Sequence, residues 1–200
     1  MTEHEQARLS GRADFDAIAG WVRAGSSVLD LGCGDGLLLK FLRQSHAIRG
    51  YGIEIDADNV IACVKNGVNV IQSDLERGLA GFDADSFDFV ILTQTLQAVR
   101  HTEEIVKEML RVGREAIVSF PNFGNWRGRL QVGLGRMPVS AELPYQWYDT
   151  PNIHLCTIAD FEDFCEAHGI DVLERVVIHE GRRVAFLANL FGSLAVFRIA

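Results

Sequence analysis

An acidic residue followed by closely spaced glycines is the part of this sequence with the clearest potential for ligand chemistry. Asp30 stands two positions before Gly32, and further glycines follow at Gly34 and Gly36. Glycine has no side chain, so main-chain N–H groups and the start of a helix can come close to a ligand at such a loop. The residue types and their spacing therefore predict a ligand pocket directly after a strand that ends near Asp30.

The spacing also indicates which ligands are excluded. The dinucleotide fingerprint requires its third glycine at the sixth position, which is Leu37 when counted from Gly32, whereas here that glycine is Gly36. A Walker-type phosphate loop has no match. A carboxylate at Asp30 would repel a pyrophosphate but would accept a hydrogen bond from an ammonium group. The pattern favours a zwitterionic or cationic ligand; a tight strand-to-helix turn without a ligand is the alternative.

Two further acids follow apolar runs that have the length of strands. Glu54 lies near the end of the run 50–56 and 18 positions after Gly36. At this place an acid can accept hydrogen bonds from a ribose. Asp74 follows the run 68–72, and its carboxylate can accept from the exocyclic amine of an adenine. Either acid alone would be an ordinary solvated carboxylate. Together with the glycine loop, they predict a nucleoside-binding site.

The elements that must position these residues alternate between strand and helix, which predicts an α/β fold. We expect a doubly wound, mostly parallel sheet with right-handed crossovers, in a single domain over residues 1–200. The expected strands are 28–31, 50–56, 68–72, 89–92, 116–120, 172–178, 184–190 and 194–199. Helices are expected after Gly36 and Asp56, from Thr102 to Gly113, and after a capping box at Thr157 and Asp160.

Composition excludes several classes of protein. The chain has 48% hydrophobic and 23% charged residues, as in ordinary globular domains, and no apolar run long enough to span a bilayer. The first residues, 1–5, are polar and acidic, unlike a signal peptide. The four cysteines form no C-x-x-C pair and no ordered Cys/His array. We therefore expect a cytoplasmic protein that has reduced thiols, no metal site and no contact with a membrane.

The charge argues against a nucleic acid as the main partner. The formal net charge is −8, whereas contacts to phosphates need clustered Lys and Arg. Arg127, Arg129 and Arg136 are a local exception, because the only acid of their segment before Pro144 is Glu142. These arginines either form a solvated face or dock an acidic protein surface.

Two segments are candidates for contact with a substrate or partner. The first is the segment 93–97 at the end of the fourth expected strand, where such sheets bind ligands, and its Gln94 side chain either contacts the cofactor or only packs. The connection 122–157 is unusually long and is expected to be a lid or insertion. Its aromatic residues, which are Trp126, Tyr145, Trp147 and Tyr148, are typical of interface anchors but would also suit a lid over the core. His154 and Tyr148 are weak candidates for a catalytic base, since a lone histidine is more often structural.

The glycine loop and the two acids resemble the S-adenosylmethionine (SAM) site of class I methyltransferases. This resemblance implies that the loop holds the methionine end, that Glu54 holds the ribose and that Asp74 reads the adenine. The implied cofactor is SAM or its product S-adenosylhomocysteine (SAH). The implied cofactor-binding residues are Asp30, Gly32, Gly34, Gly36, Glu54, Asp74, Leu75 and Gln94.

Motifs in the second half resemble a more specific family, the bacterial methionine biosynthesis proteins of the MetW type. The similar segments are 119–126, 135–138 and 147–154, in addition to the glycine loop and residues 93–98. The resemblance implies a methyltransferase-fold protein that binds SAM and supports homoserine O-acyltransferase, its protein partner. The absence of an Asn-Pro-Pro-aromatic motif after the fourth strand argues against methylation of nucleic-acid bases. An active methyltransferase with a small-molecule acceptor is the alternative, and a fold that binds no cofactor is a weaker one.

Overall fold

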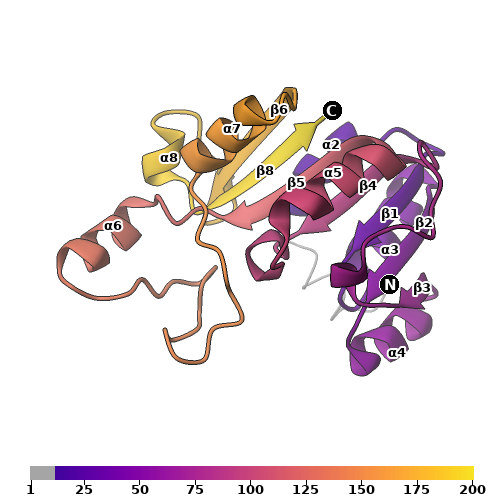
Figure 1. Ribbon diagram of the computed structural model, residues 1–200, viewed down its shortest axis with the longest axis horizontal. Coiled ribbons are helices and arrows are strands. Elements are labelled where there is room, and N and C mark those ends of the chain that lie inside the picture. Colours follow the sequence, from indigo (N-terminus) through magenta and orange to yellow (C-terminus); the bar gives the residue numbers. More distant parts are fainter. Residues whose placement is uncertain (1–11) are drawn as a thin grey trace.

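In residues 12–200, which the computed structural model describes, eight strands form one sheet (Figure 1). Their order across the sheet is β3-β2-β1-β4-β5-β8-β6-β7. The strands are β1 (Ser27–Leu31), β2 (Arg49–Glu54), β3 (Asn69–Gln72), β4 (Phe87–Thr93), β5 (Gly113–Pro121), β6 (Val172–His179), β7 (Arg182–Arg183) and β8 (Leu194–Ile199). Residues 1–11, where the expectation about a signal peptide falls, lie outside the described residues.

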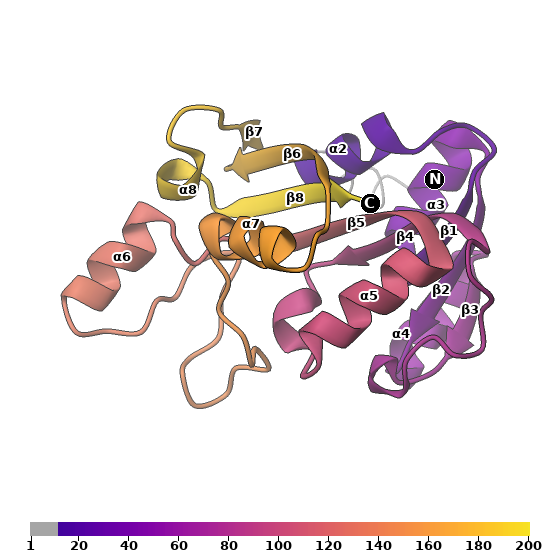
Figure 2. The same ribbon diagram turned by 45° about the horizontal axis from the view of Figure 1, so that its top comes forward.

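Helices cover both faces of the sheet, as expected for a doubly wound fold (Figure 2). The helices are α2 (Ala13–Trp21), α3 (Leu37–His46), α4 (Ala57–Lys65), α5 (Thr102–Val112), α6 (Trp126–Gly133), α7 (Ile158–Ala167) and α8 (Ala188–Phe191), with 3₁₀ turns η1 (Leu75–Arg77) and η2 (Leu96–Ala98). Leu29 of β1 packs in one core cluster with residues of α5 and α7, whereas Val28 packs in the other with residues of α2 and α3. None of the helices described here is long and apolar enough to cross a bilayer.

Local sequence signals fix where the elements begin. Asp56 caps α4 by accepting a hydrogen bond from Asn59 N at 2.9 Å. At α7, Thr157 Oγ1 accepts from Asp160 N at 3.2 Å, and Asp160 Oδ2 accepts from Thr157 N at 3.1 Å. The predicted capping box is therefore confirmed.

The strand order places the topological switch point between β1 and β4. Strands β1 to β5 are parallel, and β8 runs antiparallel to both β5 and β6. The chain leaves β1 toward β2 on one side, whereas β4 and β5 lie on the other. In open α/β sheets ligands bind at such a switch point, outside the carboxyl ends of the strands.

The predicted strand 184–190 is wrong. After the turn at Glu180 and Gly181, only the two residues of β7 pair with β6, and the chain then forms the short helix α8. Leu187 adopts a left-handed conformation with φ 45°, which ends any extended segment. The run is apolar, yet it does not extend β7 along β6, whose opposite edge pairs with β8. Its residue Phe186 remains 76% exposed. The apolar composition of the run was a poor guide here, because within residues 12–200 no strand pairs with it beyond β7.

The long connection contains α6 and an irregular segment, and it projects from the body of the molecule (Figures 1 and 2). We call residues 126–155 the arm. Its C-terminal end, at the base of the arm, is attached to η2, because Ile153 N and His154 N both donate to Gln97 O, at 2.8 and 3.0 Å. The function of the segment 122–157 as a lid remains a prediction.

Candidate cofactor site

The glycine loop connects β1 to α3 in a conformation that its glycines allow. Gly32, Gly34 and Gly36 have φ values of +65°, +55° and +76°, in the left-handed region that other residues rarely adopt. A Cβ on Gly32 would lie 3.0 Å from Thr95 Oγ1, and one on Gly36 would lie 3.0 Å from Cys63 Sγ. A Cβ on Gly34 would meet nothing within 4 Å. The first and third glycines thus allow close packing, while the middle one faces open space.

Glu54 fastens this loop to the end of β2. Its side chain is buried at 7% exposure, and its Oε2 atom accepts from Gly34 N at 2.8 Å. Its Oε1 atom accepts from Ile55 N and Asp56 N, both at 2.9 Å. A carboxylate offers about four acceptor positions. One position therefore remains for a donor on a ligand.

Asp30 is the unusual group of the site. It is 1% exposed, and neither of its carboxylate oxygens has a hydrogen-bond partner among residues 12–200. Burial, and secondly the charge of Glu54, raise the pKa of Asp30 to about 8. A buried polar group without a partner is costly, and a cation nearby would offset that cost.

Asp74 follows β3 and begins η1. Its Oδ1 atom accepts from Glu76 N at 3.0 Å, which caps the 3₁₀ turn. The other carboxylate oxygen, Oδ2, is left without a hydrogen bond in the described part of the chain. This oxygen can therefore accept from a ligand without disturbing the cap.

A cavity of about 290 Å³ lies at the carboxyl ends of β1, β2 and β3. Four of the predicted residues line it, namely Gly32, Glu54, Asp74 and Leu75. The other lining residues were not predicted to bind the cofactor, although Thr95 lies in the segment 93–97; they are Ile53, Ile55, Ser73, Glu76, Thr95, Ala98 and Val99. The available signal for Thr95, Ala98 and Val99 was their position directly after the fourth strand, β4, which pairs with β1.

The remaining predicted residues lie around the cavity rather than in its lining. Asp30, Gly34 and Gly36 belong to the end of β1 and to the loop itself. Gln94 has an exposed side chain, and its N–H donates to Ser119 O at 2.9 Å with φ at +50°. The described geometry thus gives Gln94 a backbone role at the end of β4.

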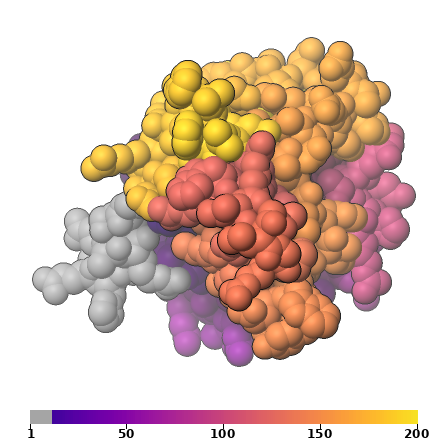
Figure 3. Space-filling model, turned by 90° about the vertical axis from the view of Figure 1, so that its left-hand side faces the viewer, coloured from indigo at the N-terminus to yellow at the C-terminus, as the bar shows by residue number. Residues whose placement is uncertain are grey.

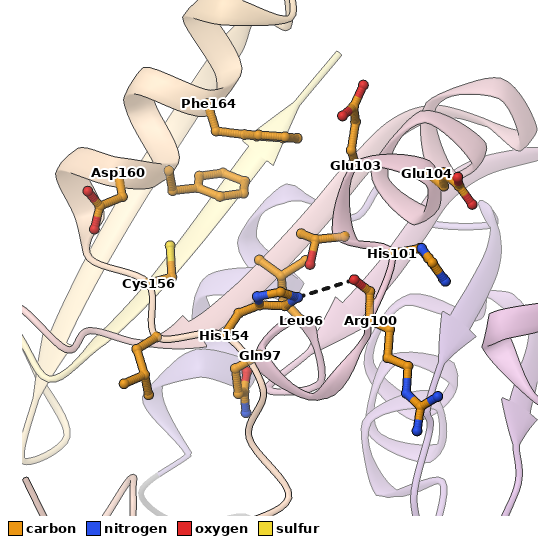
Figure 4. A pocket seen from close by; sticks show the side chains of 13 residues that line it. Leu96, Gln97, Arg100, His101, Glu103, Glu104, His154, Cys156, Asp160 and Phe164 are labelled. Atoms are coloured by element: carbon orange, nitrogen blue, oxygen red, sulfur yellow. Dashed lines mark hydrogen bonds between the residues drawn. The ribbon is translucent and has the colours of Figure 1, made fainter. Parts of the chain in front are cut away.

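The two candidate bases lie away from this cavity. His154 lines a second cavity of about 490 Å³ between α5 and α7, where its Nε2 lies 3.2 Å from Arg100 O (Figure 4). Tyr148 lies on the arm and is 70% exposed. The tertiary structure therefore brings together the acids and the glycine loop, but not these two residues.

The turn η2 separates the two cavities. Its neighbours Thr95 and Val99 line the first cavity, whereas Gln97 and Arg100 line the second. Arg100 N donates to Glu76 Oε1 at 2.7 Å, while Arg100 O faces His154. One short segment thus contacts both the cofactor cavity and the base of the arm.

Comparisons with solved structures identify the fold. A SAM-dependent methyltransferase from Mesorhizobium loti matches with a TM-score of 0.72 at 14% identity, over 96% of this chain and 99% of that chain. Magnesium protoporphyrin IX methyltransferase from Synechocystis PCC 6803, solved with bound SAH, matches with a TM-score of 0.66 at 16% identity, over 100% of this chain and 87% of that chain. At such low identity, these similarities establish the methyltransferase fold alone.

Sequence comparisons identify the family. A relative from Rhodopirellula baltica, the bifunctional methionine biosynthesis protein MetXA/MetW, is 42% identical over 183 residues. The match spans 86% of this chain but only 29% of that longer protein. The model of the family described as methionine biosynthesis protein MetW matches residues 12–199. With that match over nearly its whole length, the chain belongs to the MetW family of methionine biosynthesis proteins.

Proposed function

We propose that this methionine biosynthesis protein binds SAM or SAH at the carboxyl ends of β1 to β3 and, in that role, supports homoserine O-acyltransferase. The cofactor assignment rests on the buried carboxylate of Asp30 beside the glycine loop, which has no hydrogen-bond partner among the described residues. Because its ionised form is disfavoured in the protein alone, Asp30 favours a ligand that brings positive charge.

The charges of the ligand complement this site. SAM has an ammonium group and a positively charged sulfonium, and it supplies a transferable methyl group when it is bound. An ionised Asp30 would attract the positive charge of the ligand strongly, because the two would interact in a low-dielectric environment. The free acceptor position of Glu54 suits a ribose hydroxyl, and Asp74 Oδ2 suits the amine of an adenine.

The proposed partner rests on the relative from R. baltica, in which the two names MetXA and MetW are joined in one bifunctional protein. Covalent fusion keeps two domains at a high effective concentration, which is useful when the domains act together. We infer that the separate chain associates with the acyltransferase of its own organism. SAM derives from methionine, so a SAM-binding subunit would report the level of the end product if SAM binds free and complexed forms unequally.

Methyl transfer to a small molecule gains no support from the position of the candidate bases. His154 lines the second cavity and Tyr148 is exposed on the arm. A methyltransferase fold by itself does not imply methyl transfer, because one fold carries many functions.

Two measurements test the proposal. Calorimetric titration of the purified chain with SAM and with SAH should give saturable binding, which Asp30→Asn weakens. The acyltransferase of the same organism should be more active with this chain than without it. Absence of binding to both ligands would overturn the cofactor assignment, and unchanged acyltransferase activity at saturating protein would overturn the supporting role. Equal stability of the complex with and without SAM would remove the sensing function only.

A further inference from the structure

The arm carries a surface that the other residues of the described range 12–200 leave uncovered. Two hollows on it, of about 640 and 120 Å³, share the residues Met137, Gln146 and Trp147. The two hollows adjoin at these shared residues, and we call them together the arm groove, defined by Arg136, Met137, Tyr145, Trp147 and Ile153. Figure 3 shows the arm, in red to orange, at the front of this face of the molecule.

The apolar residues of the groove are exposed to an unusual degree. Trp147 is 73% exposed, Met137 52%, Ile153 51% and Tyr145 46%. Tyr148 packs edge-to-face against Trp147, with 5.7 Å between the ring centroids, and is 70% exposed. The three aromatic side chains leave roughly 400 Å² uncovered, about half of what one partner contributes to a standard interface. Exposed apolar surface of this size is typical of an interaction site.

The same groove has a positive charge in an otherwise acidic protein. Arg127 forms an ion pair with Glu180, and Arg129 donates to Gly124 O at 2.6 Å, so the structure itself uses both of these residues. Arg136 is exposed and forms no ion pair within residues 12–200. The formal charge of the whole chain is −8. A partner surface that is apolar with an acidic residue opposite Arg136 would therefore fit the groove.

We propose that the arm groove is the docking surface for the acyltransferase. This inference rests on the proposed function and adds the place of contact. The fused relative shows that a second protein part is joined to a MetW part, and this chain spans only 29% of that relative. The partner is expected to insert an apolar side chain between Trp147 and Met137 and to pair a carboxylate with Arg136.

Other occupants fit less well. A two-fold contact of the groove with a second copy would bring the two Arg136 side chains toward each other, which is unfavourable. An anionic membrane would attract Arg136 and the aromatic residues but would repel a chain of charge −8. Both alternatives enter the test as outcomes.

The test measures binding of the full-length chain to the purified acyltransferase of the same organism. Trp147→Ala should raise the Kd about 30-fold, which is typical of an aromatic hot spot, and Arg136→Glu should raise it about 10-fold at low salt and less at high salt. Ile61→Ala, on exposed α4, and Arg49→Glu, at the opposite end of the sheet, are matched controls that should leave the Kd unchanged. All four variants should bind SAM as the unaltered chain does.

The following outcomes would overturn the proposed docking surface. If the unaltered chain binds the acyltransferase and the two groove variants bind equally well, the docking surface is wrong while the proposed function stands. If the unaltered chain does not bind the acyltransferase, the proposed partner is wrong and the inference falls with it. A dimer that becomes a monomer in Trp147→Ala would assign the groove to a second copy. Binding to phosphatidylglycerol vesicles that Trp147→Ala abolishes would assign it to a membrane. Either result would overturn the proposal.

Discussion

The glycine-loop site and the arm groove differ in what they leave unsatisfied. At the loop, side chains are buried, backbone N–H groups are held by Glu54, and one carboxylate, Asp30, has no hydrogen-bond partner in the described part of the chain. On the arm, apolar side chains such as Trp147 are exposed, and the cation of Arg136 has no counter-charge among residues 12–200. A missing charge partner inside a pocket indicates a small cationic ligand, whereas missing cover on a projecting segment indicates another macromolecule.

The two regions are connected through η2. The arm is hydrogen-bonded to Gln97 O, and Arg100 N is hydrogen-bonded to Glu76, which lines the cofactor cavity. A ligand that shifts Glu76 would act on the attachment point of the arm. The following variants separate the two regions or reveal a link between them.

The largest effect is expected at Glu54. Glu54→Ala removes the acceptor of three backbone N–H groups and leaves them without a partner, so it should lower the free energy of unfolding by about 3 kcal/mol. SAM affinity should fall by at least about 100-fold, because the loop is no longer held. Chemical denaturation and calorimetry measure both. Glu54→Gln, which keeps one oxygen acceptor, is the control, and normal SAM affinity in Glu54→Ala would contradict the site.

A second variant, Asp30→Asn, should have opposite effects on stability and on binding. The pKa of Asp30 is raised to about 8, so the native state holds a proton that the unfolded state has lost above about pH 4. The stability of the unaltered chain therefore falls as the pH rises from about 4 to 8, and this fall should be absent in Asp30→Asn. At pH 8 the variant should be more stable by about 2–4 kcal/mol. Equal pH dependence in both proteins would refute this explanation.

Binding of SAM should release a proton from Asp30. Positive charge from the ligand lowers the pKa of Asp30, so affinity should increase between pH 6 and 8, by up to about tenfold per pH unit. Calorimetry at pH 7 in two buffers with different ionisation enthalpies measures the proton release, and Asp30→Asn should show none. If the unaltered chain releases no proton, Asp30 is not the charge partner of the ligand.

A smaller effect is expected at the base of the arm. His154→Ala removes the contact with Arg100 O and should cost at most about 1 kcal/mol of stability, with SAM affinity changed by less than about threefold. Hydrogen exchange of η2 should be faster in the variant. Methyl transfer by the unaltered chain that His154→Ala abolishes would instead support a catalytic base.

The smallest effect on the fold is expected on the arm itself. Trp147 is 73% exposed, so Trp147→Ala should change the free energy of unfolding by less than about 0.5 kcal/mol and leave SAM affinity unaltered. Denaturation and calorimetry provide the measurement. A loss of SAM affinity would mean that the arm contributes to the cofactor site, and the two regions would then act as one.

Much of the fold could be predicted because its signals are local. The apolar run before Asp30, the cap at Asp56 and the capping box at Thr157 act within a few residues, and each appears where the sequence predicts it. The predicted strand 184–190 failed because an apolar run becomes a strand only where another strand pairs with it. The lining residues Thr95 and Val99 escaped prediction, since they come from a segment distant in sequence.

The sequence by itself determined the family, the parallel sheet and the placement of the acids Asp30, Glu54 and Asp74 at strand ends, because periodicity, capping and motif spacing are properties of the chain. Only the tertiary structure decided that Asp30 has no partner within residues 12–200, that His154 faces another cavity and that the aromatic residues of the arm are exposed. Burial and neighbourhood depend on residues far apart along the chain, and local patterns therefore do not contain them.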